Sequence, residues 1–151
     1  MFHPVYVWLQ KLGYTHPIHP MVTHIPVGLT LGTLVFGLVS LIFRRVRLKL
    51  TAWHCALLAV ISVVPTAFLG FMDWEEIYKA QWMPVIIAKM ILAGCLFVTL
   101  LVALLLGRRR DGEDESARPW RNPRSIVALV LYAVSGGLVV VLGYLGGTLV
   151  Y

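Results

Sequence analysis

The sequence HPIHPMVTHIP at residues 16–26 stands directly before the apolar run VGLTLGTLVFGLVSLIF at residues 27–43. The run is long enough to enter a bilayer, whose hydrocarbon core takes about 20 apolar residues of helix. Its entrance holds three histidines: His16, His19 and His24. Imidazole is costly to bury in hydrocarbon unless it is paired or ligated. The junction therefore predicts a membrane-spanning helix with a candidate haem or metal site at its mouth.

The composition of the 151-residue chain extends this prediction to the whole molecule. Apolar residues make up 59% and charged residues only 13%, against roughly 25% charged residues in a soluble domain. Four stretches are long enough to span, at about residues 21–43, 52–71, 84–107 and 125–150. We therefore predict an all-α integral membrane four-helix bundle that forms a single transmembrane domain over residues 1–151. The aromatic and aliphatic residues near the start predict a short amphipathic outer segment.

The positive charges are concentrated between the predicted spans. Four lie between spans one and two and six between spans three and four, ten of the thirteen Lys and Arg residues. Such residues stay on the cytoplasmic side of a membrane. We therefore attribute the net charge of +6 to the topology of the chain in the membrane and predict no binding of nucleic acid. An even number of spans then places both termini, the histidines and the loop at residues 71–83 on the outer side.

Prolines and aromatic residues predict local structure at this outer side. Pro17, Pro20 and Pro26 favour a regular helix that starts between Met21 and Ile25, since proline is tolerated in a helix's first turn and disfavoured deeper in. His16 and His19 would then lie in an extended segment. The loop at residues 71–83 has aromatic residues four apart, which predicts either a short helix parallel to the membrane or a docking surface for a partner.

Glycine repeats predict how the helices meet. The pattern Gly-x-x-x-Gly occurs at Gly28 and Gly32 and again at Gly143 and Gly147. Small residues at this spacing let helix backbones approach closely in lipid. The same residues would also line a groove that admits a flat cofactor.

The candidate ligands are His24, His19 and His16, which could hold a small metal ion. A haem would more easily use His24 with a ligand from another helix. Lys89 lies inside the third predicted span, where a charged side chain is costly to bury, and it is therefore a candidate functional residue. It could snorkel to the outer surface, pair with an acidic residue of the outer loop, or bind a cofactor after losing its proton to burial. Asp73 could accept a proton or orient a histidine.

Zinc hydrolysis would use the same three histidines with an acidic residue as base, but no His-Glu-x-x-His motif is present.

Three ordered motifs resemble the DUF2231 family of predicted four-helix bacterial membrane proteins. The first is His19-Pro20 followed by His24-Ile25-Pro26, and the second is Gly70-x-x-Asp73-Trp74. The third is the closing Gly146-Gly147-x-Leu149-Val150-Tyr151. The resemblance covers nearly the whole chain and implies a multi-pass protein of the bacterial inner (plasma) membrane. Fusion of some members to Rieske-type domains implies a redox setting.

One position departs from the family pattern. Many members that look like this carry His-Met-Ile-Leu-Asn in the third span, where this chain has Lys89-Met90-Ile91-Leu92-Ala93. If that histidine pairs with the first-span histidine across a cofactor, lysine has replaced one ligand here.

Two functions follow from these observations. The first is a membrane electron-transfer protein that holds haem b or interacts with a quinone near the outer face and works with other membrane or periplasmic redox subunits. The second is a cofactor-free accessory or assembly subunit of a larger membrane redox complex. The first depends on a ligand set at the outer face, and the second on the glycine-rich helix faces.

Overall fold

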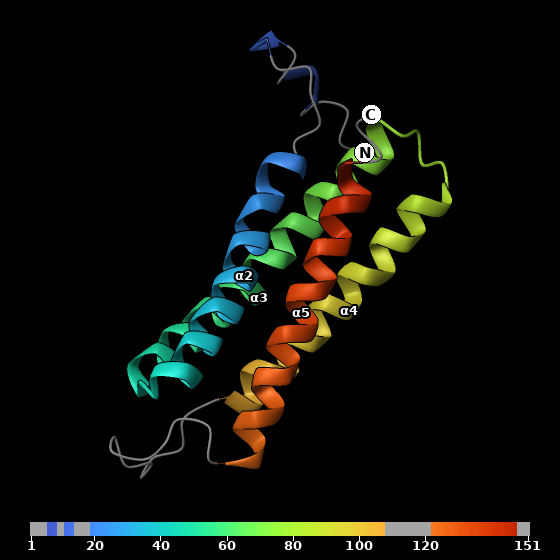
Figure 1. The fold of residues 1–151 in the computed structure, drawn as a ribbon. Coiled ribbons are helices and arrows are strands. Elements are labelled where there is room, and N and C mark those ends of the chain that lie inside the picture. Colours follow the sequence, from blue (N-terminus) through green and yellow to red (C-terminus); the bar gives the residue numbers. More distant parts are fainter. Residues whose placement is uncertain (1–5, 9–10, 14–18, 108–121, 148–151) are drawn as a thin grey trace.

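The computed structural model describes residues 6–8, 11–13, 19–107 and 122–147. Four long helices account for most of them: α2 (His19–Phe43), α3 (Val46–Glu76), α4 (Pro84–Gly107) and α5 (Pro123–Gly147). Figure 1 shows them as a bundle of roughly parallel rods, and the described ranges contain no strand. Each helix is long and apolar enough to cross a membrane. The predicted all-α membrane four-helix bundle is therefore confirmed.

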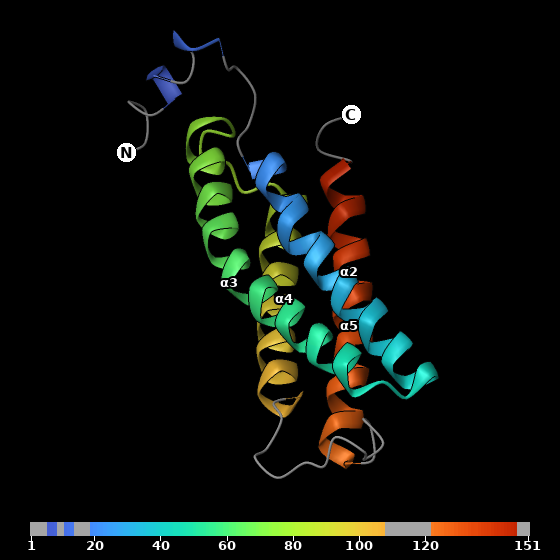
Figure 2. The same cartoon turned by 90° about the vertical axis from the view of Figure 1, so that its left-hand side faces the viewer.

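Successive helices run in opposite directions, so the bundle has two chemically different ends. The pairs α2–α3 and α4–α5 pack closely, and the two pairs meet through α2–α5 and α3–α4 contacts. We call one end the His19 end, where α2 and α4 begin and α3 and α5 finish (Figures 1 and 2). The opposite end, the arginine end, holds the turn with Arg44 and Arg45 and also the start of α5.

Two helix boundaries at the His19 end differ from the sequence-based expectation. Helix α2 begins at His19 instead of between residues 21 and 25, because Pro20 fits in a first turn and a distant carboxylate receives the His19 N–H. Helix α3 continues to Glu76, so residues 71–76 end a span and do not form a separate surface helix. The chain then turns through Lys79 and Ala80, whose φ angles are 51° and 55°.

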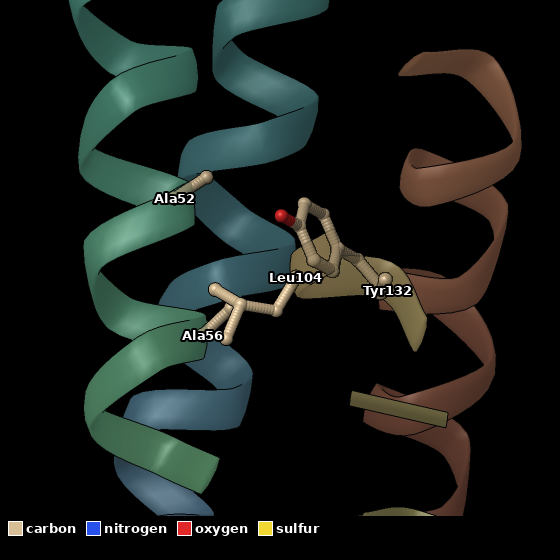
Figure 3. Close-up of a cluster of buried hydrophobic side chains, with 5 residues drawn as sticks. Ala52, Ala56, Leu104 and Tyr132 are labelled. Atoms are coloured by element: carbon tan, nitrogen blue, oxygen red, sulfur yellow. The ribbon is translucent and has the colours of Figure 1, made fainter. Parts of the chain in front are cut away.

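One of the two clusters of the core packs small residues around a large aromatic ring. Tyr132 of α5 is 1% exposed and packs with alanines of α3 and α4 and with Leu104. Figure 3 shows its ring between α5 and the α3 residues Ala52 and Ala56. The buried face of α2 carries no large apolar side chain; it consists of Pro26, Thr30, Thr33, Gly37 and Ser40. The threonine hydroxyls bond to carbonyls one turn back, which satisfies them inside the membrane.

Close helix packing uses different glycines from those in the Gly-x-x-x-Gly repeats. A Cβ added at Gly28, Gly143 or Gly147 would meet nothing within 4 Å, whereas one added at Gly32 would lie 3.6 Å from Cys55 Sγ of α3; of the two repeats, only Gly32 faces a neighbouring helix of this chain. The close contacts are at Gly136, where an added Cβ would lie 2.7 Å from Leu34 Cδ2, and at Gly107, where it would lie 2.9 Å from Tyr132 Oη. Spacing alone predicts a smooth face but not the side of the helix that is buried.

Large apolar side chains cover the outside of the bundle. Each helix exposes several of them, including Phe36, Phe68, Val98 and Val140. Only about a third or less of each apolar window is buried inside the chain, from 28% to 33%. This surface contacts the lipid bilayer.

Candidate functional site

The carboxylate of Asp73 organises the His19 end. Asp73 lies near the end of α3 and is 3% exposed. Its Oδ2 accepts the backbone N–H of His19 at 2.8 Å, and its Oδ1 accepts the hydroxyl of Tyr6. The first N–H groups of a helix lack intrahelical partners, and negative charge is favourable beside them. Asp73 therefore caps α2 from another helix and ties the N-terminal segment to the same point.

The His19 ring is held by a second residue of α3. Its Nδ1 lies 2.9 Å from the carbonyl oxygen of Thr66. The ring also lies against Gly70, since a Cβ added there would come within 2.9 Å of Nδ1. Thr66, Gly70 and Asp73 are spaced by four and three residues, so they share one face of α3. One helix face thus fixes both the backbone and the ring of His19.

This arrangement assigns the roles of the two ring nitrogens. A carbonyl oxygen can only accept, so Nδ1 carries the proton in the bond to Thr66. In the neutral ring, Nε2 then keeps its lone pair, and no hydrogen bond to it occurs in the described part of the chain. A ring whose N–H donates to a backbone carbonyl while the other nitrogen stays available is typical of histidines that bind metals or accept protons.

Lys89 is the charged neighbour of this ring. It lies in the second turn of α4 and is half-buried. Its positive charge and the negative charge of Asp73 both act on the His19 imidazole. Gly146 of α5 faces the ammonium, because a Cβ there would lie 3.9 Å from Nζ. Among the described residues, no carboxylate forms an ion pair with Lys89. All four helices therefore contribute a residue to this cluster: His19, Asp73, Lys89 and Gly146.

The other candidate histidines do not join the cluster in the described ranges. His24 is exposed on α2, and five residues of helix place it about 140° around the axis from His19. His16 lies outside the described residues, so its part in a three-histidine site stays a prediction. No group of three His, Cys, Asp or Glu side chains in the residues searched could hold a metal ion. A further histidine, His54, lies in the third turn of α3 at the arginine end, in edge contact with Trp53.

The turn between α3 and α4 is closed by aromatic residues. The rings of Trp74 and Trp82 lie 4.6 Å apart between centroids, and Trp74 Nε1 donates to the Gln81 carbonyl at 3.0 Å. Trp82 is 63% exposed. Trp74 directly follows Asp73 in the sequence. We expect both rings at the interface between membrane and water, where tryptophan is enriched.

A model of a known protein family matches most of this chain. The family model described as predicted membrane protein (DUF2231) matches residues 15–151. The chain belongs to this family. No curated protein and no solved structure matches the chain. The structure gives a physical reason for two of the DUF2231 motifs, because His19 of the first motif contacts Gly70 and Asp73 of the second.

The sequence identified Asp73, His19 and Lys89 as candidate site residues, but it did not reveal Thr66, Tyr6 and Gly70 as their contact partners. Thr66 acts through a backbone carbonyl, which no side-chain pattern reveals. Tyr6 is separated from Asp73 by 67 residues, and only its place in an aromatic N-terminal stretch hinted at a role. Gly70 was visible as part of the DUF2231 motif but not as the contact surface of an imidazole.

Proposed function

We propose that this DUF2231 protein is a membrane electron-transfer protein that binds a quinol at its His19 end. The observation that carries the proposal is the fixed His19 ring, whose Nδ1–H bonds to Thr66 and whose Nε2 has no hydrogen bond among the described residues. A quinol needs a hydrogen-bond acceptor for one hydroxyl and tolerates a donor at its second oxygen. His19 Nε2 and the Lys89 ammonium supply these two functions on one end of the bundle.

The chemistry assigned to the chain is limited to binding and proton transfer. Nε2 accepts one proton from a quinol hydroxyl as one electron leaves the quinol for a redox centre on a membrane or periplasmic partner. The Lys89 ammonium donates a hydrogen bond to the other quinol oxygen. Asp73 positions His19 through its backbone and does not touch the quinol. The apolar surface of the bundle supports access for such a substrate, since quinols dissolve in lipid.

Haem b fits the described residues less well. The sequence favoured a haem held by His24 and a ligand from another helix over one held by His19 and His24. The described part of the His19 end offers one anchored imidazole, while His24 is exposed on another side of α2. These two histidines therefore do not face each other across one haem.

Quinol titration tests the proposal. The protein in nanodiscs is titrated with a short-chain ubiquinol analogue that is kept reduced, and tryptophan fluorescence is followed because Trp74 and Trp82 lie at the same end. His19→Gln is expected to weaken binding about tenfold, the loss of one good hydrogen bond. His24→Gln is the matched control and is expected to bind as the wild type does. Equal affinity in the wild type and His19→Gln would refute the quinol site, and a reducible Soret band would favour haem instead.

The proposal includes an orientation in a bacterial inner membrane. The arginine end would face the cytoplasm, because positive residues remain on that side; both termini would then be periplasmic. Single cysteines at Lys79 and Arg44, in a chain with Cys55 and Cys95 replaced by alanine, test this. An impermeant maleimide should label the first position in intact cells and the second only after lysis. Labelling of both in intact cells would contradict the orientation.

A second function is favoured by the lipid-facing side of α5. Gly137, Gly143 and Gly147 have open space beside them, and Tyr144 is 74% exposed. Such a surface suits a helix of another subunit, as expected of an accessory subunit in a redox complex. Replacement of Gly143 by leucine should then reduce the size of the native complex in mild detergent. An unchanged complex would argue against this role.

A further inference from the structure

Two helices that run in the same direction begin at the arginine end. These are α3 and α5, and neither has an acidic residue in its first turn. The N-terminus of a helix carries partial positive charge, so the two starts together favour an anion at this end. The described residues also place five basic side chains there: Arg44, Arg45, Arg47, Lys49 and Arg124.

The acidic residues of the chain do not balance this charge. Those in the described ranges are Asp73, Glu75 and Glu76, and all three lie at the His19 end of α3. The loop at residues 108–121 lies outside the described residues. Its sequence has five arginines and four acidic residues, so it adds no net negative charge. The arginine end therefore carries an excess of positive charge.

A hydrogen bond joins the starts of α3 and α5. Lys49 Nζ donates to Ser125 Oγ at 2.9 Å, and Ser125 is 4% exposed. Because an ammonium only donates, Oγ is the acceptor in this bond, and the hydroxyl hydrogen needs another partner. Within the described ranges no acceptor for that hydrogen occurs. A buried donor without an acceptor is costly, so this position favours an added acceptor oxygen beside the ammonium.

Apolar side chains place the Lys49–Ser125 pair at the edge of the hydrocarbon. Leu50 directly follows Lys49 and is 41% exposed, and Ile126 directly follows Ser125 and is 48% exposed. In a membrane these apolar side chains contact acyl chains, whereas basic residues beside them lie at the level of the lipid headgroups. A phospholipid phosphate supplies acceptor oxygens and negative charge at this level.

We infer that the arginine end binds the phosphate of an anionic phospholipid at the Lys49–Ser125 pair. The Ser125 hydroxyl donates to a phosphate oxygen, while Lys49 and Arg124 supply positive charge beside it. The bound lipid contacts the starts of both α3 and α5, so it holds the α2–α3 pair and the α4–α5 pair together at this end. The site lies at the opposite end from His19 and does not depend on quinol binding.

Native mass spectrometry of the full chain tests the site. The protein in detergent receives equal amounts of phosphatidylglycerol and phosphatidylcholine, and the wild type is expected to retain phosphatidylglycerol preferentially. Ser125→Ala removes one hydrogen bond to a charged acceptor and should weaken that binding about tenfold. Lys49→Gln should weaken it at least as much. Ser62→Ala, at a serine bonded within α3, and Lys79→Gln, at the His19 end, are the matched controls and should bind as the wild type does.

Ser125→Ala separates a built site from general attraction between a basic surface and anionic lipid, because it leaves the net charge of the chain at +6. Equal retention of phosphatidylglycerol by the wild type and by both site variants would overturn the inference. A preference that appears only after the four loop acids are replaced by their amides would show that the loop occupies the site, and it would overturn the inference too. These acids are Asp111, Glu113, Asp114 and Glu115.

The melting temperature gives a second measurement. Phosphatidylglycerol should raise the Tm of the wild type above its value in phosphatidylcholine, since a ligand that binds only the folded state stabilises it. This rise should be lost in Ser125→Ala and in Lys49→Gln and kept in the two controls. An equal rise produced by inorganic phosphate in phosphatidylcholine would reject a lipid in favour of a soluble anion.

Discussion

The backbone N–H of His19, at the first residue of α2, bonds to the carboxylate of Asp73 at 2.8 Å, across 54 residues of chain. The start of one membrane helix is thus set by the end of its neighbour. The same pair joins two DUF2231 motifs, which gives a mechanical reason for a His-Pro at the first span and an Asp-Trp after the second. Four predictions follow from this and from the packing of the core.

Replacement of Asp73 by alanine should destabilise the bundle by about 2–4 kcal/mol, since two bonds to a charged acceptor are lost. Asn at this position keeps an acceptor oxygen and should cost less. The free energy of unfolding in mixed SDS micelles measures both. If Asp73→Ala unfolds at the same SDS fraction as the wild type, the capping role is wrong.

Replacement of Gly70 by alanine should displace the His19 ring, because the new Cβ would lie 2.9 Å from Nδ1. The bond to Thr66 should be lost, and the ¹⁵N chemical shifts of His19 should no longer report one fixed neutral tautomer. Gly94→Ala is the control, since its Cβ would meet nothing within 4 Å. That change should leave His19 unaltered and could add about 0.4–1 kcal/mol of stability. An unperturbed His19 spectrum in Gly70→Ala would show that the ring does not depend on this contact.

Adjacent glycines of α5 should respond oppositely to alanine. A Cβ at Gly136 would lie 2.7 Å from Leu34 Cδ2, whereas one at Gly137 would have open space. We expect Gly136→Ala to cost about 1–3 kcal/mol by overpacking and Gly137→Ala to be neutral or mildly stabilising. Leu34→Ala should relieve the first substitution, so that the two changes are non-additive in a double-mutant cycle. If the stability losses of Gly136→Ala and Leu34→Ala simply add, these two residues are not the contact between α2 and α5.

Truncation of Tyr132 should open a cavity in the core. The ring is 1% exposed among small residues of α3 and α4, and Tyr132→Ala should cost about 2 kcal/mol or more. Tyr132→Phe keeps the packing and should cost less. Tyr144→Ala, at a residue that is 74% exposed, is the control and should change stability by less than about 0.5 kcal/mol. Equal effects of the two alanine variants would contradict the assigned core.

The amino-acid sequence by itself determined the fold class, the number of spans and the two-ended charge distribution. The reason is the solvent: in lipid every backbone polar group must be bonded internally, so an apolar run of sufficient length becomes a helix. The alternating direction of four such helices then brings Arg44 and Arg124 to one end and His19 and Asp73 to the other. The DUF2231 motifs could also be recognised from the sequence, since each of them is a local pattern.

Only the tertiary structure decided which of these residues act together. Residue spacing favoured His24 and the Gly-x-x-x-Gly repeats, yet His19 is the anchored ring and Gly70, Gly107 and Gly136 are the close contacts. Periodicity states which residues share a helix face, but the rotation of each helix about its axis comes from packing against the others. The start of α2 at His19 likewise depends on a carboxylate from α3, and a partner so distant in sequence leaves no mark on the local pattern.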